Sequence, residues 1–186
     1  MRAVLIILVV TLAACGQDDV AGPPREASPQ PAERPHASAI AGPGGWGSVR
    51  IGMSRTQAVE ALGGVEGAAP AGAALEQCHY LRPAGIEGVM VMIERGRVSR
   101  IDITQGAPET VTDTGLGLGA TEAEVRARYD AALEHEPHKY EPPPSGYFTW
   151  WNARARQGIR YVVGPESRVV AILVGGESIR YVEGCS

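Results

Sequence analysis

The 186-residue sequence has no cluster of basic residues: 17 Lys and Arg stand against 21 Asp and Glu, and the net charge is −4. Binding to nucleic acid needs clustered positive charge that neutralises phosphates, so we expect no nucleic acid among its partners. The sequence also lacks a run of the roughly 20 apolar residues that a membrane-spanning helix needs. Its N-terminal apolar run, residues 3–12, is shorter.

Catalytic motifs are missing as well. Residues 176–180 (GESIR) lack the last glycine of a serine nucleophile elbow. Residues 115–120 (GLGLGA) have the spacing of a dinucleotide fingerprint, but that fingerprint needs a parallel βαβ unit, and we expect hairpins here. His135 and His138 are fewer than the three or four ligands of a zinc site, and Pro137 interrupts any helix that would align them. We therefore expect no enzyme, no cofactor and no metal.

The N-terminus has the layout of an export signal: a basic head at Arg2, the apolar run, and small residues before Cys15. The segment resembles a bacterial lipobox, which implies cleavage after residue 14 and lipid on Cys15, with two or more acyl chains for a stable anchor. Gly16 replaces the Asp that retains such lipoproteins at the inner membrane, which implies the periplasmic face of the outer membrane. The alternative is an ordinary secretion signal with a chance cysteine. Cleavage would remove Arg2 and no acid, so the net charge would become −5.

Residues 15–44 are rich in proline and small or polar residues, a composition that favours a disordered tether behind the lipid. The remaining residues, 45–186, suffice for one domain. Within it, two stretches correspond to each other and suggest halves at about 45–107 and 108–186.

Each half contains a capping box, in which a hydroxyl caps a helix start and a side chain three residues later reaches back. Ser54 with Gln57 forms the first box, and Thr121 with Glu124 forms the second. A short helix is expected after each box. Strands are expected in both halves, and they are, by residue number, 78–81, 88–94 and 97–103, then 147–152, 158–164 and 167–174. The prediction is an α+β fold: one antiparallel sheet of about six strands from two helix-β-β-β repeats, with the helices on one face.

The segment around Ser54 (Ile-Gly-Met-Ser-Arg, residues 51–55) resembles the opening helix of SmpA/OmlA-type outer-membrane lipoproteins. These are accessory subunits of the machinery that assembles outer-membrane barrels. A tandem pair of such units resembles the fold of β-lactamase inhibitory proteins, whose concave sheet binds a partner enzyme. The ending Tyr-Val-Glu-Gly-Cys (residues 181–185) resembles a group of uncharacterised proteobacterial lipoproteins.

Lipidation of Cys15 would leave Cys78 and Cys185, an even pair in an oxidising compartment. We expect a disulfide between them that closes a loop of more than a hundred residues. The alternatives are two buried thiols or a redox pair, but no Cys-x-x-Cys spacing favours redox work.

Aromatic residues are scarce, and five of the ten lie within residues 140–151. Alternation along a strand puts Tyr147 and Trp151 on one face and Trp150 on the other. Exposed aromatics anchor protein partners, so Tyr147, Trp150, Trp151 and the nearby Arg154 are the candidate binding residues, unless the proline-rich loop that precedes them (residues 142–144) covers them. The leading hypothesis is a lipid-anchored module that binds a periplasmic or envelope protein. The alternative is a carbohydrate or peptidoglycan binder that stacks sugars on Trp150 or Trp151. An enzyme ranks third.

Overall fold

The computed structural model describes residues 39–66 and 78–185. The predicted signal segment, Cys15 and the predicted tether as far as residue 38 lie outside the described residues. Strand β1 (Ala39–Gly42) falls within the stretch predicted as tether.

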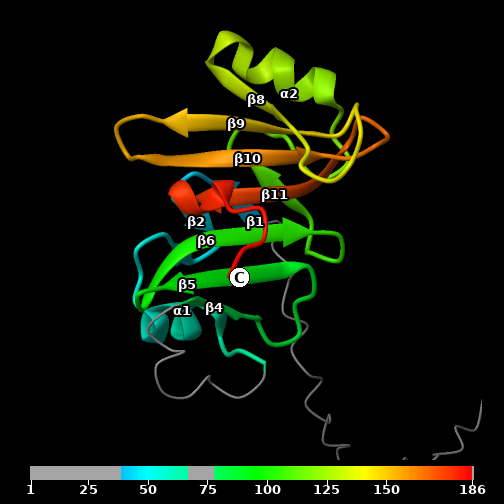
Figure 1. Ribbon diagram of the computed structural model, residues 1–186. Coiled ribbons are helices and arrows are strands. Elements are labelled where there is room, and N and C mark those ends of the chain that lie inside the picture. Colours follow the sequence, from blue (N-terminus) through cyan, green and yellow to red (C-terminus); the bar gives the residue numbers. More distant parts are fainter. Residues whose placement is uncertain (1–38, 67–77, 186) are drawn as a thin grey trace, which may run out of the picture. The chain divides into compact units, whose positions relative to one another are not determined.

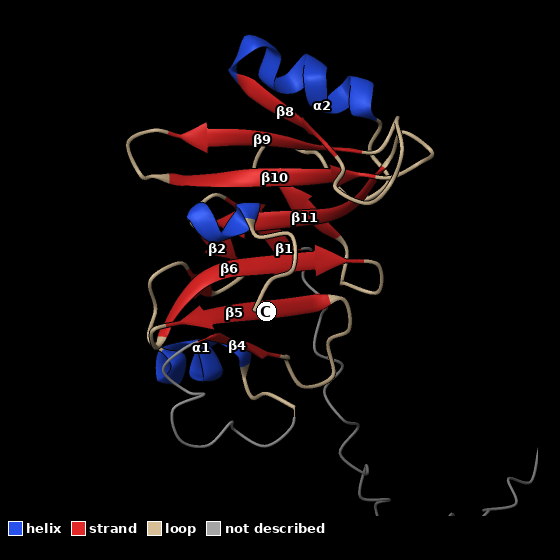
Figure 2. Cartoon of the chain, viewed as in Figure 1, coloured by secondary structure: helices blue, strands red, loops and turns tan. Residues whose placement is uncertain are grey.

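The larger of two sheets has seven strands, all antiparallel (Figures 1 and 2). In spatial order they are β4 (Cys78–Leu81), β5 (Val89–Glu94), β6 (Arg97–Thr104), β11 (Val169–Gly175), β10 (Gln157–Val163), β9 (Gly146–Asn152) and β8 (Leu133–Pro137). Two meanders therefore meet where β6 pairs with β11. The hairpins β5–β6 and β10–β11 lie where the sequence predicted them.

The smaller sheet has four short strands, in the order β3 (Val49–Arg50), β2 (Gly45–Trp46), β1 and β7 (Thr110–Thr112). Strands β1 and β7 are parallel, and Ile40 is the partner of Val111. This sheet packs behind β6 and β11 in the view of Figure 1, and Trp46 joins the main core.

The predicted α+β sheet of six strands from two helix-β-β-β repeats is wrong. The fold is mainly β, with a seven-stranded and a four-stranded sheet. Two features account for the difference. Residues 39–50 and 110–112 pair into a sheet of their own. In the second half, the helix stops at Tyr129 and is followed by an additional strand, β8, that begins at Leu133.

Two eight-residue helices begin at the predicted capping boxes. The side chain of Ser54 caps α1 (Arg55–Leu62), and that of Thr121 caps α2 (Glu122–Tyr129). Both boxes are confirmed, because the side-chain oxygens of Gln57 and Glu124 accept hydrogen bonds from the backbone N–H groups of Ser54 and Thr121. Short 3₁₀ turns follow as η2 (Asp130–Ala132) and η3 (Glu177–Arg180). Neither helix of the described residues has the length or apolarity needed to cross a membrane.

The two faces of the large sheet have different characters. Side chains such as Val91, Ile101 and Ile159 point to one face, where the smaller sheet and both helices complete an apolar core. Arg100 and Arg160 alternate with them and lie on the opposite face, which we call the polar face. The C-terminal residues lie across this second face (Figure 1).

Candidate functional site

Residues 178–185 form a strap across the polar face, running from η3 toward β4. The guanidinium of Arg100 fixes its middle: Nη1 donates to the carbonyl oxygens of Ser178 at 2.9 Å and of Tyr181 at 2.8 Å. The hydroxyl of Ser178 donates to the carbonyl of Ser99 at 3.0 Å. The strap is thus tied to β6 at several points.

Arg100 is buried together with Asp102 on the same strand. The Nε atom of Arg100 lies 2.6 Å from Oδ1 of Asp102, and Nη2 donates to Oδ2 at 2.9 Å. Burial raises the pKa of the Asp102 carboxyl, and the adjacent guanidinium opposes that rise. A buried charge persists only where it is paired and hydrogen-bonded, so each of these residues depends on the other.

A disulfide between Cys185 and Cys78 fixes the end of the strap, as the sequence predicted, with a Cα–Cα distance of 5.4 Å. Gly184 precedes it with φ +66°, and a Cβ there would lie 2.2 Å from the hydroxyl of Tyr80. Only glycine meets both conditions. The backbone of the strap therefore passes close to the Tyr80 hydroxyl of β4.

Ion pairs hold the start of the strap to the edge strand β8. Arg180 bridges Glu134 and Glu136, and its Nη1 lies 2.7 Å from Oε1 of Glu136. Arg160, only 2 % exposed, donates to Oε2 of the same carboxylate at 2.7 Å. These hydrogen bonds, that from Arg160 foremost, lower the pKa of Glu136. The guanidinium of Arg180 also lies 5.2 Å from the ring centroid of Trp151.

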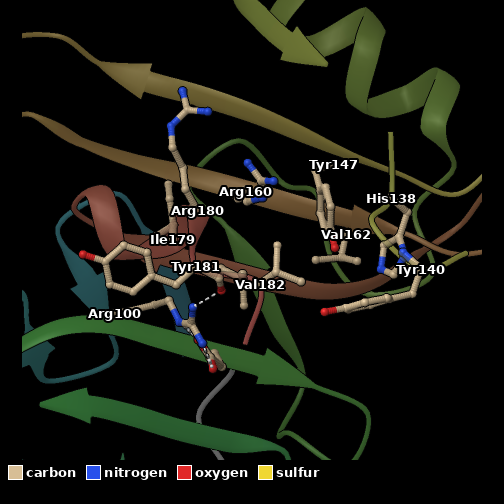
Figure 3. A pocket seen from close by; sticks show the side chains of 12 residues that line it. Arg100, His138, Tyr140, Tyr147, Arg160, Val162, Ile179, Arg180, Tyr181 and Val182 are labelled. Atoms are coloured by element: carbon tan, nitrogen blue, oxygen red, sulfur yellow. Dashed lines mark hydrogen bonds and ion pairs between the residues drawn. The ribbon is translucent and has the colours of Figure 1, made fainter. Parts of the chain in front are cut away.

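A cavity of about 260 Å³ opens on the polar face between the strap and the loop that joins β8 to β9. Figure 3 shows its three sources: Val162 from the sheet, Tyr181 and Val182 from the strap, and His138 and Tyr140 from the loop. Three of the five exposed large hydrophobic residues in the described part of the chain line it. They are Tyr140 (60 % exposed), Tyr181 (46 %) and Val182 (40 %).

The loop side of the cavity is ordered by His138. Its Nδ1 accepts hydrogen bonds from the backbone N–H groups of Tyr140, at 3.3 Å, and Glu141, at 3.0 Å. Its ring lies 4.7 Å from that of Tyr147, which is buried. Tyr140 is thus presented to solvent by a hydrogen-bonded turn.

The four predicted binding residues do not converge. Tyr147 lines the cavity, and Trp151 lies on the same face under Arg180, its indole N–H donating to Glu134. Trp150 lies on the core side, with its ring 5.5 Å from that of Tyr129. Arg154 is exposed in the turn between β9 and β10 and does not line the cavity.

Tyr140, Tyr181 and Val182 were not among the binding residues predicted from the sequence. The available signal for the last two was the ending Tyr-Val-Glu-Gly-Cys, where two apolar residues precede the disulfide cysteine. The disulfide holds this ending at a fixed place on the surface. Its two apolar side chains therefore stay exposed to water unless another group packs on them.

The histidines considered for a metal site point to opposite faces: His135 stacks on Phe148 at 4.6 Å, whereas His138 contacts Tyr147. Among residues 39–66 and 78–185, no three His, Cys, Asp or Glu side chains gather as metal ligands.

Comparison of the chain with protein-family models, with curated proteins and with solved structures found no match in any of the three.

Proposed function

We propose that the chain is a lipid-anchored protein-binding module whose site is the cavity between the strap and the β8–β9 loop. The observation that carries this proposal is the gathering of Tyr140, Tyr181 and Val182 around one concavity. Exposed aromatic and aliphatic side chains around a pocket are typical of the anchors of protein interfaces. The lipid on Cys15 would keep the module at the periplasmic face of the outer membrane, among envelope proteins.

The cavity lies just below the size range of pockets for small ligands. Pockets for small ligands enclose about 300–1,000 Å³, whereas this one encloses about 260 Å³. That volume suits one large side chain of a partner. Glycan binding, the other hypothesis, has less support because Trp150 already stacks on Tyr129 and Arg180 covers Trp151.

Site-specific cross-linking in the envelope tests the proposal. A photoreactive residue replaces Tyr140 or Tyr181 in the full chain. The matched control places it at Val170, which is 51 % exposed and does not line the cavity. We expect the same adduct from both cavity positions and none from the control, and Val182→Asp should remove it. No adduct from either cavity position, or the same adduct from Val170, would refute the proposal.

A further inference from the structure

The charges around the cavity indicate which kind of peptide would occupy it. The three arginines that line it are already matched to carboxylates: Arg100 to Asp102, Arg160 to Glu136, and Arg180 to Glu134 and Glu136. Arg160 and Arg180 each donate to Glu136 at 2.7 Å, and Arg100 donates to Asp102 at 2.9 Å, which are distances of charge-assisted hydrogen bonds. The guanidinium groups therefore hold the site together and leave little charge for an anionic ligand.

Two carboxylate residues stand next to cavity-lining residues in the chain. Glu141 follows Tyr140 and Glu183 follows Val182 in the chain, and both carboxylate residues are exposed. An oxygen of Glu177 lies 3.8 Å from Nε of Arg180. Arg180 also pairs with Glu134 and Glu136, so one cation serves three carboxylates. Lys139 is also near, with its ammonium 5.4 Å from the centroid of the Tyr140 ring. Counted with the three arginines and their partners, these residues comprise four cations and six carboxylates, a net charge of −2.

The apolar centre itself is formed before any partner arrives. Val162, Leu173 and Ile179 contribute apolar lining. Tyr181 and Tyr140 lie on opposite sides of Val182 (Figure 3). The disulfide and Arg100 hold the strap, and His138 holds the loop. A preformed site saves the conformational entropy that ordering its walls would cost.

From these observations we infer that the cavity binds an aromatic or large aliphatic side chain with cationic residues on either side of it in an extended segment of the partner. The apolar side chain fills the space between Tyr140 and Tyr181, and the flanking cations meet Glu141 and Glu183. This inference rests on the proposed function, because it specifies the partner of the same cavity.

Synthetic peptides test the inference on the full-length protein in detergent micelles. The probes are labelled Gly-Lys-Phe-Lys-Gly, Gly-Glu-Phe-Glu-Gly and Gly-Lys-Ala-Lys-Gly, and the readout is fluorescence anisotropy at several salt concentrations. The Lys-Phe-Lys peptide should bind about tenfold more tightly than the alanine peptide, because the ring is buried. It should bind about threefold or more tightly than the Glu-Phe-Glu peptide, and this preference should shrink as salt rises.

Charge-neutral variants supply the control. Glu141→Gln with Glu183→Gln should abolish the preference for lysine over glutamate, whereas Glu60→Gln with Glu109→Gln, two exposed positions away from the cavity, should preserve it. Equal or tighter binding of the Glu-Phe-Glu peptide, equal binding of the alanine peptide, or no saturable binding at about millimolar concentration would overturn the inference. Adducts at Tyr140 and Tyr181 alongside any of these results would leave the proposed function standing. Loss of those adducts would refute the proposed function itself.

Discussion

Replacement of Arg100 by Met should be among the most costly single changes in the described part of the molecule. The residue is 4 % exposed, and its side chain bonds to Asp102, to the hydroxyl of Tyr80 and to the carbonyls of Ser178 and Tyr181. Methionine keeps most of the volume but removes every one of these bonds. Removing one partner of a buried ion pair costs about 3–5 kcal/mol, because the other charge stays buried without compensation.

The cost should depend on pH in a defined direction. Burial already raises the pKa of Asp102 above its ordinary value of 3.8, and Arg100 is the group that limits the rise. Without the guanidinium, the folded-state pKa rises further. A group whose folded pKa is raised contributes stability that is present below the unfolded pKa and lost as pH rises through the folded pKa. The deficit of Arg100→Met should therefore be larger at pH 8 than at pH 5.

Urea unfolding of the full chain at these two pH values measures the deficit, with Arg100→Met/Asp102→Leu as the companion variant. Removing both charges should recover part of the loss, because no lone carboxylate remains. Recovery should be incomplete, since the carbonyls of Ser178 and Tyr181 still lack their donor and each costs about 1–3 kcal/mol if it stays dry. A deficit below about 1 kcal/mol for the single variant, or one that does not change with pH, would refute this account of the strap.

Three further predictions concern the disulfide, a helix cap and an edge ion pair. Cys78→Ser/Cys185→Ser should lower the free energy of unfolding by up to ~4–5 kcal/mol, because the bridge closes a loop with a sequence separation of 107. Dithiothreitol should then cause no further loss of stability of this variant in urea unfolding. Thr121→Ala should cost about 0.5–2 kcal/mol by the same assay, because α2 loses its cap, and an unchanged midpoint would contradict the capping role. The bond from Arg160 lowers the pKa of Glu136, so its contribution to stability is present above the ordinary value of 4.5 and is lost as pH falls through the lower folded value. In thermal melts over a series of pH values, Glu136→Gln should reduce the loss of stability at acidic pH. An unchanged loss would exclude this carboxylate as its source.

Local signals in the sequence predicted the parts of the fold that depend on neighbours in the chain. A hydroxyl and an acceptor three residues apart suffice for a capping box, so Ser54 and Thr121 marked both helix starts correctly. The hairpins were also correct, because apolar strands and tight turns lie within a few residues of each other. The disulfide followed from cysteine number and compartment rather than from geometry.

Strand β8 was not predicted, and the ion pairs that help to hold it come from far along the chain. Its sequence, Leu-Glu-His-Glu-Pro, shows a weak apolar alternation and ends in proline. The strand is held by pairing with β9 and by ion pairs from Arg160 and Arg180, which are 24 and 44 residues from Glu136. Long-range contacts of this kind override local propensity.

The small sheet escaped prediction for a different reason. Residues 39–50 are rich in glycine, and their composition is that of a linker. Their structure depends on parallel pairing of Ile40 with Val111, and on Trp46, which donates a hydrogen bond to Thr110 across 64 residues. Neither contact leaves a periodic pattern in the local sequence. The same limit applies to the candidate site, whose walls come from the loop, the sheet and the strap.

The strap links stability to the proposed binding site. Tyr181 and Val182 form one side of the cavity because Arg100 binds the Tyr181 carbonyl and because Cys185 is joined to Cys78. The sheet beneath has its own core on the opposite face, built from side chains that do not touch the strap's bonds. Loosening the strap should therefore degrade the apolar rim while the sheet persists. The polar face thus has two separate roles. Its buried charges fix the backbone of the strap. That backbone in turn presents apolar side chains that the sheet alone would not place at the surface.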